Sequence, residues 1–153
     1  MAHQIYDEFL KQLLTGDINL NTADEVKVIL CSELPPVGST DYMQIVASPY
    51  QIANTAGTLA TEYIAGGLAL QNVVIAEGAS SITFNADDIT WNSNTDIIQA
   101  KCAVLYHNNS SNATRAKPLM MCFDFGENKT VAANENFVIE WNNTTNSIFE
   151  ISS

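Results

Sequence analysis

The sequence predicts a mainly β protein, an antiparallel β-sandwich with jelly-roll- or Ig-like connections and one amphipathic helix at its N-terminal end. Apolar residues near the N-terminus recur with the period of a helix. From residue 26 onwards the period becomes two, as in half-buried strands. Asn, Gly, Asp, Ser and Pro separate these short runs and supply the turns that such a sandwich needs.

The first expected element is a helix over residues 4–14. One broad apolar face runs along it, formed by Ile5, Tyr6, Phe9, Leu10, Leu13 and Leu14. This face has two alternative uses: it is a candidate assembly interface, or it closes one end of the sandwich within its own subunit. We divide the chain into an N-terminal helix at residues 1–16, packed on or extending from the domain, and a single β-sandwich domain at residues 17–153.

The other expected elements are strands, about eight in number. They are placed at residues 26–31, 41–47, 68–76, 82–84, 89–91, 98–106, 119–125, 137–141 and 148–151. The first of these is apolar on both faces, as in a strand buried on two sides, and the second has the weakest pattern. A loop is expected at residues 142–146. Residues 37–66 mix strand, helical and loop character, so their structure is not assigned.

The length, composition and charge of the chain exclude several classes of protein. A chain of 153 residues, 46% hydrophobic and 15% charged, has enough apolar material for one core. No apolar run reaches the roughly 18 residues of a membrane span, and the N-terminus lacks the basic region of a signal peptide. A net charge of −11 repels phosphate backbones and anionic lipid, and the six Lys and Arg residues form no cluster. We expect a soluble protein that folds in a cytosol and binds neither nucleic acid nor membrane.

Candidate catalytic groups are few. His3 lies near the N-terminus and His107 lies in a polar loop, and neither has a motif around it. We therefore expect both imidazoles to be exposed and unpaired. The common motifs of serine hydrolases, zinc proteases and nucleotide-binding proteins are absent from the sequence. The expectation is a protein that is not an enzyme, with no catalytic residue and no cofactor.

Candidate metal ligands also have simpler interpretations. Asp87 and Asp88 lack the spacing of a calcium-binding EF-hand loop, so they are expected to form a turn. Three thiols, those of Cys31, Cys102 and Cys122, lie in apolar runs without metal-ligand spacing. We expect them to be reduced and buried in the core, and we expect no metal site.

Several stretches resemble a family of small tailed-bacteriophage virion proteins. They are the amphipathic opening helix, the runs Ile18-Asn19-Leu20 and Asp24-Glu25-Val26-Lys27-Val28-Ile29-Leu30, the pair Gly66-Gly67, and the segments 84–91, 103–106, 123–126 and 137–141. The resemblance runs over nearly the whole chain, and its landmarks are structural rather than catalytic. It implies this fold and membership of a virion assembled in the host cytoplasm.

The role that the resemblance implies is a coat accessory role. We expect a capsid decoration or cement protein that binds the major capsid protein or other virion proteins and forms a homo-oligomer. The alternative within the virion is a tail, neck or head-fibre component, which the small size and the lack of a long coiled-coil segment disfavour. A carbohydrate-binding β-sandwich is the alternative of another class. It needs exposed Trp or Tyr side chains, whereas the sequence directs Trp91 and Trp141 into the core.

Overall fold

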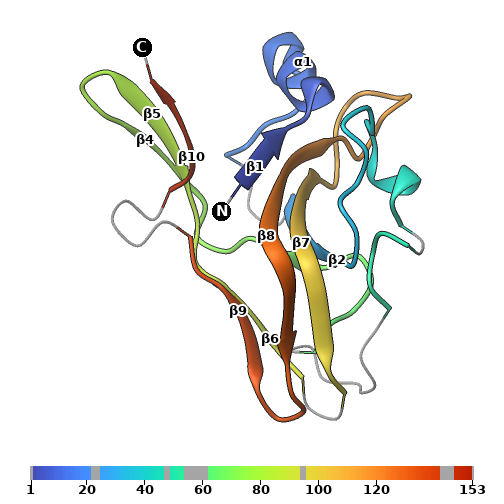
Figure 1. Ribbon diagram of the computed structural model, residues 1–153. Helices are drawn as coiled ribbons and strands as arrows, with labels where there is room; N and C mark the ends of the chain where they lie inside the picture. The colour runs from blue at the N-terminus through green and yellow to red at the C-terminus, as the bar shows by residue number, and fades with distance from the viewer. Residues whose placement is uncertain are drawn as a thin grey trace.

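The computed structural model describes residues 2–21, 25–46, 49–53, 62–93, 96–141 and 147–152. Its largest sheet has five antiparallel strands in the order β1-β8-β7-β2-β3 (Figure 1). These strands are β1 at Ala2–Ile5, β2 at Val26–Cys31, β3 at Leu68–Ala69, β7 at Ile98–His107 and β8 at Leu119–Val131. The long strands β7 and β8 form its centre, because each pairs with a neighbour on both sides.

A two-stranded ribbon lies against the five-stranded sheet. It consists of β6 at Ile89–Asn92 and β9 at Asn136–Ile139, paired antiparallel. Alternation along the ribbon turns Trp91, Phe137 and Ile139 inward, where all are at most 4% exposed. The ribbon and the sheet are therefore the two layers of a sandwich-like arrangement.

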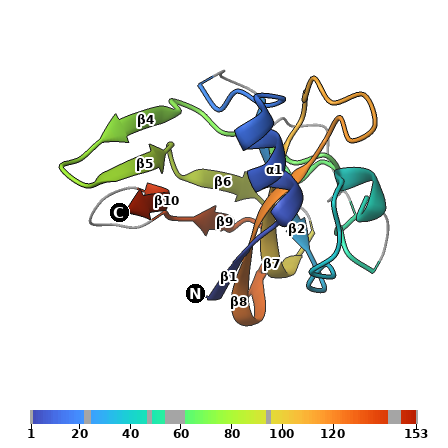
Figure 2. The same ribbon diagram turned by 90° about the horizontal axis from the view of Figure 1, so that it is seen from above.

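The remaining three strands form a small sheet that we call the arm. It consists of β4 at Val74–Glu77, β5 at Ser81–Asn85 and β10 at Ser147–Ser152, in the order β10-β5-β4. Figures 1 and 2 show the arm projecting from the body, with the tip of the β4–β5 hairpin farthest from the five-stranded sheet. Both β4 and β10 are edge strands of this sheet.

The helix α1 spans Asp7–Thr15. Asp7 and Glu8 occupy its first turn, where negative charge is favoured by the helix dipole. It ends at Gly16, whose φ of 78° only glycine adopts readily, and the Asp17 N–H then donates to the Gln12 carbonyl over 2.9 Å. Of the described residues, only one other short helical turn exists, a 3-10 helix at Tyr42–Gln44.

Both faces of the five-stranded sheet are covered. The first core fills the space between this sheet, the ribbon, α1 and the base of the arm, and it includes Phe9, Val28, Leu30 and Trp91. The second core lies on the opposite face, beneath the segment that contains the 3-10 helix. There the ring of Tyr42 stacks on that of Tyr106 with 4.3 Å between centroids.

The sequence-based fold class is confirmed: the chain is mainly β, with antiparallel sheets and one α-helix near the N-terminus. The expected strand at residues 26–31 matches β2, which contributes side chains to both cores. The strands expected at 82–84, 89–91, 98–106 and 148–151 also form, within one or two residues. The predicted boundary at residue 16 stays a prediction, although Phe9 and Ile18 share the first core.

Four expected elements differ from the structure. The strand expected at 119–125 continues to Val131 as β8, because its second half pairs with the start of β7. Residues 4 and 5, expected at the start of the helix, belong to strand β1, because they pair with β8. The apolar run at 68–76 is not one strand, since Asn72 adopts a φ of 50° and separates β3 from β4. Residues 42–44 form a helical turn instead of a strand. The expected loop at 142–146 lies outside the described residues.

Candidate assembly surface

The buried half of the predicted helix face belongs to the subunit's own core. Phe9 is 2% exposed and lies in the first core, against which the half-buried Leu13 packs. Tyr6 precedes the helix and is 1% exposed in the second core. These three residues are therefore covered within one copy of the chain, as the alternative of a helix closing its own sandwich requires.

The other half of the face is open. Ile5 and Leu10 are each 40% exposed, and Leu14 is 88% exposed. Leu10 and Leu14 are one helical turn apart and share a side of α1. Only this half of the predicted interface remains accessible to a partner.

A polar network fixes α1 to the loop between β7 and β8. Gln12 is fully buried, and its amide donates to Glu8 Oε1 over 2.9 Å and to the Arg115 carbonyl over 3.1 Å. The Arg115 guanidinium donates to the other oxygen of Glu8, and the Ser110 hydroxyl donates to Gln12 Oε1. Because buried polar groups are costly to expose without partners, this network opposes detachment of the helix from its own subunit.

The charge of Glu8 is stabilised by the same contacts. Burial alone raises the pKa of this carboxyl, but the hydrogen bonds from Gln12 and Arg115 and the Arg115 charge outweigh burial, so the pKa is lowered. The helix is therefore attached more firmly when Glu8 is ionised.

The arm carries an apolar face that the fold leaves partly open. Ile75, Ile82 and Ile151 lie on one face, since Ile82 is registered with Ile151 and Ile75 is registered with Phe84, two residues along β5. Their exposed fractions are 44%, 47% and 52%. On the opposite face, Val74 is 51% exposed.

The base of the same arm face is anchored to the body. Phe84 and Phe149 stack with 5.1 Å between centroids, and Phe84 is 2% exposed. Phe149 in turn contacts Phe9 of α1. The arm is thus held at its base, and its outer part presents isoleucines to solvent.

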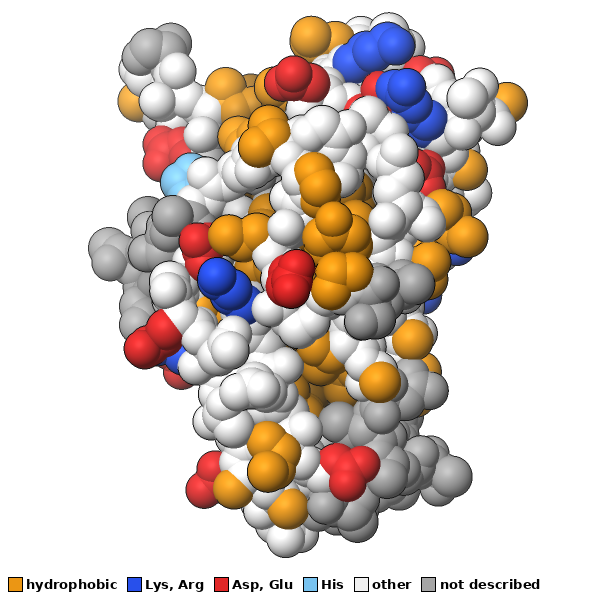
Figure 3. Space-filling view, turned by 45° about the vertical axis from the view of Figure 1, so that its right-hand side comes forward, with side chains coloured by type: hydrophobic (Ala, Val, Ile, Leu, Met, Phe, Trp, Pro, Cys, Tyr) orange, Lys and Arg blue, Asp and Glu red, His pale blue; other side chains and the backbone are white. Residues whose placement is uncertain are grey.

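Exposed apolar side chains also occur elsewhere on the surface. Figure 3 shows hydrophobic side chains over the middle of one face of the molecule, interspersed with polar atoms, and basic side chains gathered near its top. Single exposed apolar residues are common on soluble proteins. The arm differs because its exposed isoleucines occupy adjoining strands of one small sheet.

The three thiols lie in a row across neighbouring strands of the five-stranded sheet. Cys31 on β2 is registered with Cys102 on β7, and Cys122 on β8 is registered with Val104, two residues further along β7 and on the same face. Their exposed fractions are 0%, 0% and 3%, so the prediction that they lie in the core is confirmed. Hydrogen bonding to Cys102, together with burial, raises the pKa of the Cys122 thiol. A protonated, buried thiol is a poor nucleophile.

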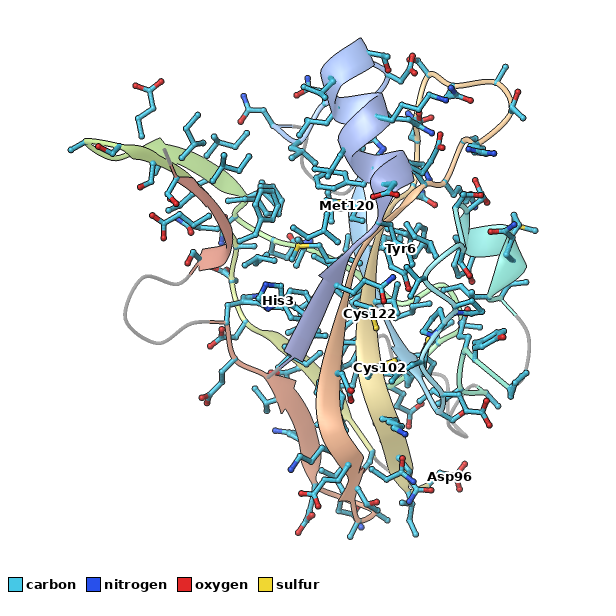
Figure 4. All side chains as sticks on the ribbon, turned by 45° about the horizontal axis from the view of Figure 1, so that its top comes forward. His3, Tyr6, Asp96, Cys102, Met120 and Cys122 are labelled. Carbon is cyan, nitrogen blue, oxygen red and sulfur yellow. The ribbon has the colours of Figure 1, made fainter. Side chains whose placement is uncertain are left out.

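One surface hollow has catalytic residue types in its lining. It measures about 360 Å³, and His3, Cys122 and Asp124 contribute to it. However, His3 is registered with Phe123, so its side chain leaves β1 on the face opposite to that of Cys122 (Figure 4). His3 is exposed, as expected. The hollow therefore lacks the contact between imidazole and thiol that cysteine catalysis needs.

His107 contradicts its sequence-based interpretation. It is fully buried at the end of β7, where its Nε2 lies 3.3 Å from the Asn19 carbonyl and 3.4 Å from Glu25 Oε2. The Asn109 N–H donates to Nδ1 over 3.4 Å. Burial lowers the pKa of this imidazole, against the opposing effects of Asn19 and Glu25. The prediction of an exposed, unpaired ring was wrong, because β7 continues one residue past Tyr106.

Asp87 and Asp88 both accept hydrogen bonds from Trp141. Asp88 Oδ1 accepts a hydrogen bond from the Trp141 backbone N–H over 3.0 Å, and the Asp87 carbonyl accepts one from the indole N–H over 2.9 Å. The Asp87 carboxylate accepts from Asn72 Nδ2. In the part of the chain that the structure describes, no group of three or more His, Cys, Asp or Glu residues is placed to hold a metal ion.

The large aromatic side chains are directed inward. Both Trp residues are at most 3% exposed, as are Tyr6, Tyr63 and Tyr106, and Tyr42 is 6% exposed. Tyr50 is half-buried. A sugar-stacking platform requires an exposed aromatic face, which these side chains do not provide.

Comparisons with known proteins give no relative. No family model, no curated protein and no solved structure matches this chain. Among the described helices, none has the length and apolar character to cross a membrane.

The sequence missed the arm as a candidate surface. The sequence places Val74 and Ile75 in a single strand at 68–76. The available signal was that these consecutive apolar residues face opposite sides of a strand that ends at the turn residue Gly78. Such a pattern fits both a buried strand and an apolar edge, and only the three-dimensional position distinguishes them.

Proposed function

We propose that this chain is a non-enzymatic structural component of a bacteriophage virion, a capsid decoration or cement protein that stabilises contacts between major capsid subunits. The arm is the observation that carries the proposal. A subunit with two filled cores still presents Ile75, Ile82 and Ile151 on one small projecting sheet. Apolar patches of this kind, rimmed by polar residues, are typical of protein–protein contact sites.

The sequence resemblance to small virion proteins supplies the setting for this contact. The partners would be the major capsid protein or other virion proteins, together with further copies of this chain. Leu10 and Leu14 on α1 offer a second, smaller apolar contact. The polar network around Gln12 keeps α1 rigid, so a partner would meet a preformed surface and lose little conformational entropy on binding.

A tail, neck or head-fibre component is the second candidate, and the same arm would serve it. The described strands form a short domain without a long helical segment, which favours a unit placed on a shell. The carbohydrate-binding alternative is disfavoured by the inward-directed Trp and Tyr side chains.

Electron cryomicroscopy of the source particle tests the proposal. Particles with the gene intact should show density for this domain at regular positions between major capsid subunits. That density should be absent from particles whose gene is deleted, and reappear when the purified chain is added back. Density at the tail, neck or fibre would favour the second candidate, and a particle without this chain would refute both.

A further inference from the structure

We propose that the free edge of β4 pairs with the same edge of a second copy of this chain, antiparallel and about a two-fold axis. The inference rests on the proposed function and deepens it by naming one partner of the arm. The occupant must be a β-strand, because the exposed feature is a row of backbone groups as well as apolar side chains.

The hydrogen-bond pattern of the hairpin identifies these backbone groups. The Gly78 N–H donates to the Ser81 carbonyl over 2.7 Å, so Gly78 and Ser81 form a hydrogen-bonded pair. Such pairs alternate with non-bonded pairs along an antiparallel ladder. The pairs Glu77 with Ile82 and Ile75 with Phe84 are therefore non-bonded. Consequently, Ile75 and Glu77 direct their backbone N–H and C=O groups away from β5.

No described strand occupies that side of β4, which is the last strand in the order β10-β5-β4. Proteins usually protect exposed edges with Lys, Pro, a bulge or an inward-pointing charge. Residues 74–76, Val-Ile-Ala, have none of these, and the one charged residue of β4, Glu77, lies at its end. The other edge of the arm is protected, since β10 has an irregular register between Ser147 and Phe149.

The β4 edge is complementary to itself. In an antiparallel pair centred on Ile75, this residue faces Ile75 of the second copy, and Val74 faces Ala76 of the second copy. The outward N–H and C=O of Ile75 then meet the C=O and N–H of Ile75 in the second copy, whereas Glu77 lies opposite Val73 of the second copy, just outside β4. The two Glu77 carboxylates lie at opposite ends of the joint ladder, so the like charges are separated.

The size of the edge determines the strength of the dimer. A four-residue strand covers far less than the roughly 800 Å² per partner of a standard interface. Each chain also carries a net charge of −11, which opposes association. We expect a dimer that is dissociated at about 1 µM and populated at about 1 mM, the effective concentration that neighbouring sites on a particle provide.

Sedimentation equilibrium of the full chain between about 1 µM and 1 mM tests the pairing, with the mass rising from monomer to dimer. Ile75→Lys should weaken the dimer by about tenfold or more, because it places a charge opposite its own copy. Val138→Lys is the matched control: Val138 lies on β9 with 46% exposure, against 44% for Ile75, and its substitution should change the dimer constant by less than about threefold. Added salt should strengthen the dimer by screening the net charge.

Ile75→Pro tests the backbone contribution. It removes an N–H that points away from β5, so thermal unfolding should remain cooperative while the dimer is lost. A wild-type chain that stays monomeric at about 1 mM overturns the pairing, and so do equal effects of Ile75→Lys and Val138→Lys. A monomer result leaves virion membership standing, whereas absence of the chain from particles overturns the proposed function and leaves the pairing standing.

Discussion

The ring of Phe9 on α1 lies edge-on to the ring of Phe149 on β10, with 6.0 Å between their centroids and 72° between their planes. This contact joins an element from each end of the chain, and through Phe84 it fixes the base of the arm. The helix is thereby part of the support for the surface that we propose binds partners.

The double substitution Phe9→Ala with Leu13→Ala should destabilise the isolated chain. Removing a buried Phe costs about 3–5 kcal/mol, and for a chain of this size the melting temperature should fall by about 10 °C. Leu14→Ala is the control, because Leu14 is 88% exposed, and its melting temperature should stay close to wild type. If both variants melt like wild type in a thermal scan, the helix does not support the core.

Acid should weaken the attachment of α1 through Glu8. The folded state lowers the pKa of Glu8, so the unfolded state binds the proton more readily. Ionised Glu8 therefore adds to the free energy of unfolding above its ordinary pKa, and this stabilisation is lost as the pH falls through the pKa of the folded state. Arg115 is 40% exposed on its side chain, so we expect only about 1–2 kcal/mol from the pair. Denaturant unfolding at pH 3–5 checks this.

Glu8→Gln should reduce the loss of stability between about pH 5 and pH 3, and Asp7→Asn, at the exposed neighbour, serves as its control. An unchanged acid profile in Glu8→Gln would show that the pair contributes nothing.

Protonation of His107 should lower the free energy of unfolding at a higher pH than protonation of Glu8 does. Burial lowers its pKa, so below the ordinary value of about 6.5 the unfolded state takes up the proton first and folding is disfavoured. Wild-type stability should therefore decline as pH falls from about 7 to 5. In His107→Gln, which retains a donor near Asn19, the free energy of unfolding should change less with pH over that range. In His3→Gln it should change with pH as in the wild type. Equal slopes in all three proteins would contradict the buried, neutral imidazole.

Elements whose own residues show their burial were predictable from the sequence, whereas elements that depend on pairing with distant residues were not. β2 was predictable because Val26–Cys31 is apolar on both faces, and β7 was predictable because Ile98–His107 begins with an alternating pattern. The end of β1, residues 4 and 5, fits the predicted helix because Ile5 continues the helical spacing of Phe9, and only pairing with β8 makes it a strand. His107 was likewise misassigned, since its burial depends on Asn19 and Glu25, which are distant in sequence.

The candidate surface was predictable only in part, for a similar reason. The helical period identified one continuous apolar face, but it could not show that the second core covers Tyr6 and the first core covers Phe9 while Leu14 stays open. The arm required knowledge of which strand forms an edge.

The three thiols should react slowly with a thiol reagent in the native state. All are buried, and the pKa of both Cys102 and Cys122 is raised. We expect labelling with Ellman's reagent to be at least about a hundredfold slower than in denaturant, since it requires opening of the sheet. Thr90→Cys places a thiol at an exposed position of β6 and should label at once. Rapid native labelling of two or more wild-type thiols would contradict the buried row.

The copy number of this chain in purified source particles, measured by quantitative mass spectrometry against the major capsid protein, tests the central claim most directly. A decoration or cement protein should be present in a fixed ratio to the major capsid protein. Ile75→Lys should lower that ratio, and Val138→Lys should leave it near wild type. A particle that contains no copies, or only trace amounts unaffected by the arm substitutions, would contradict the account.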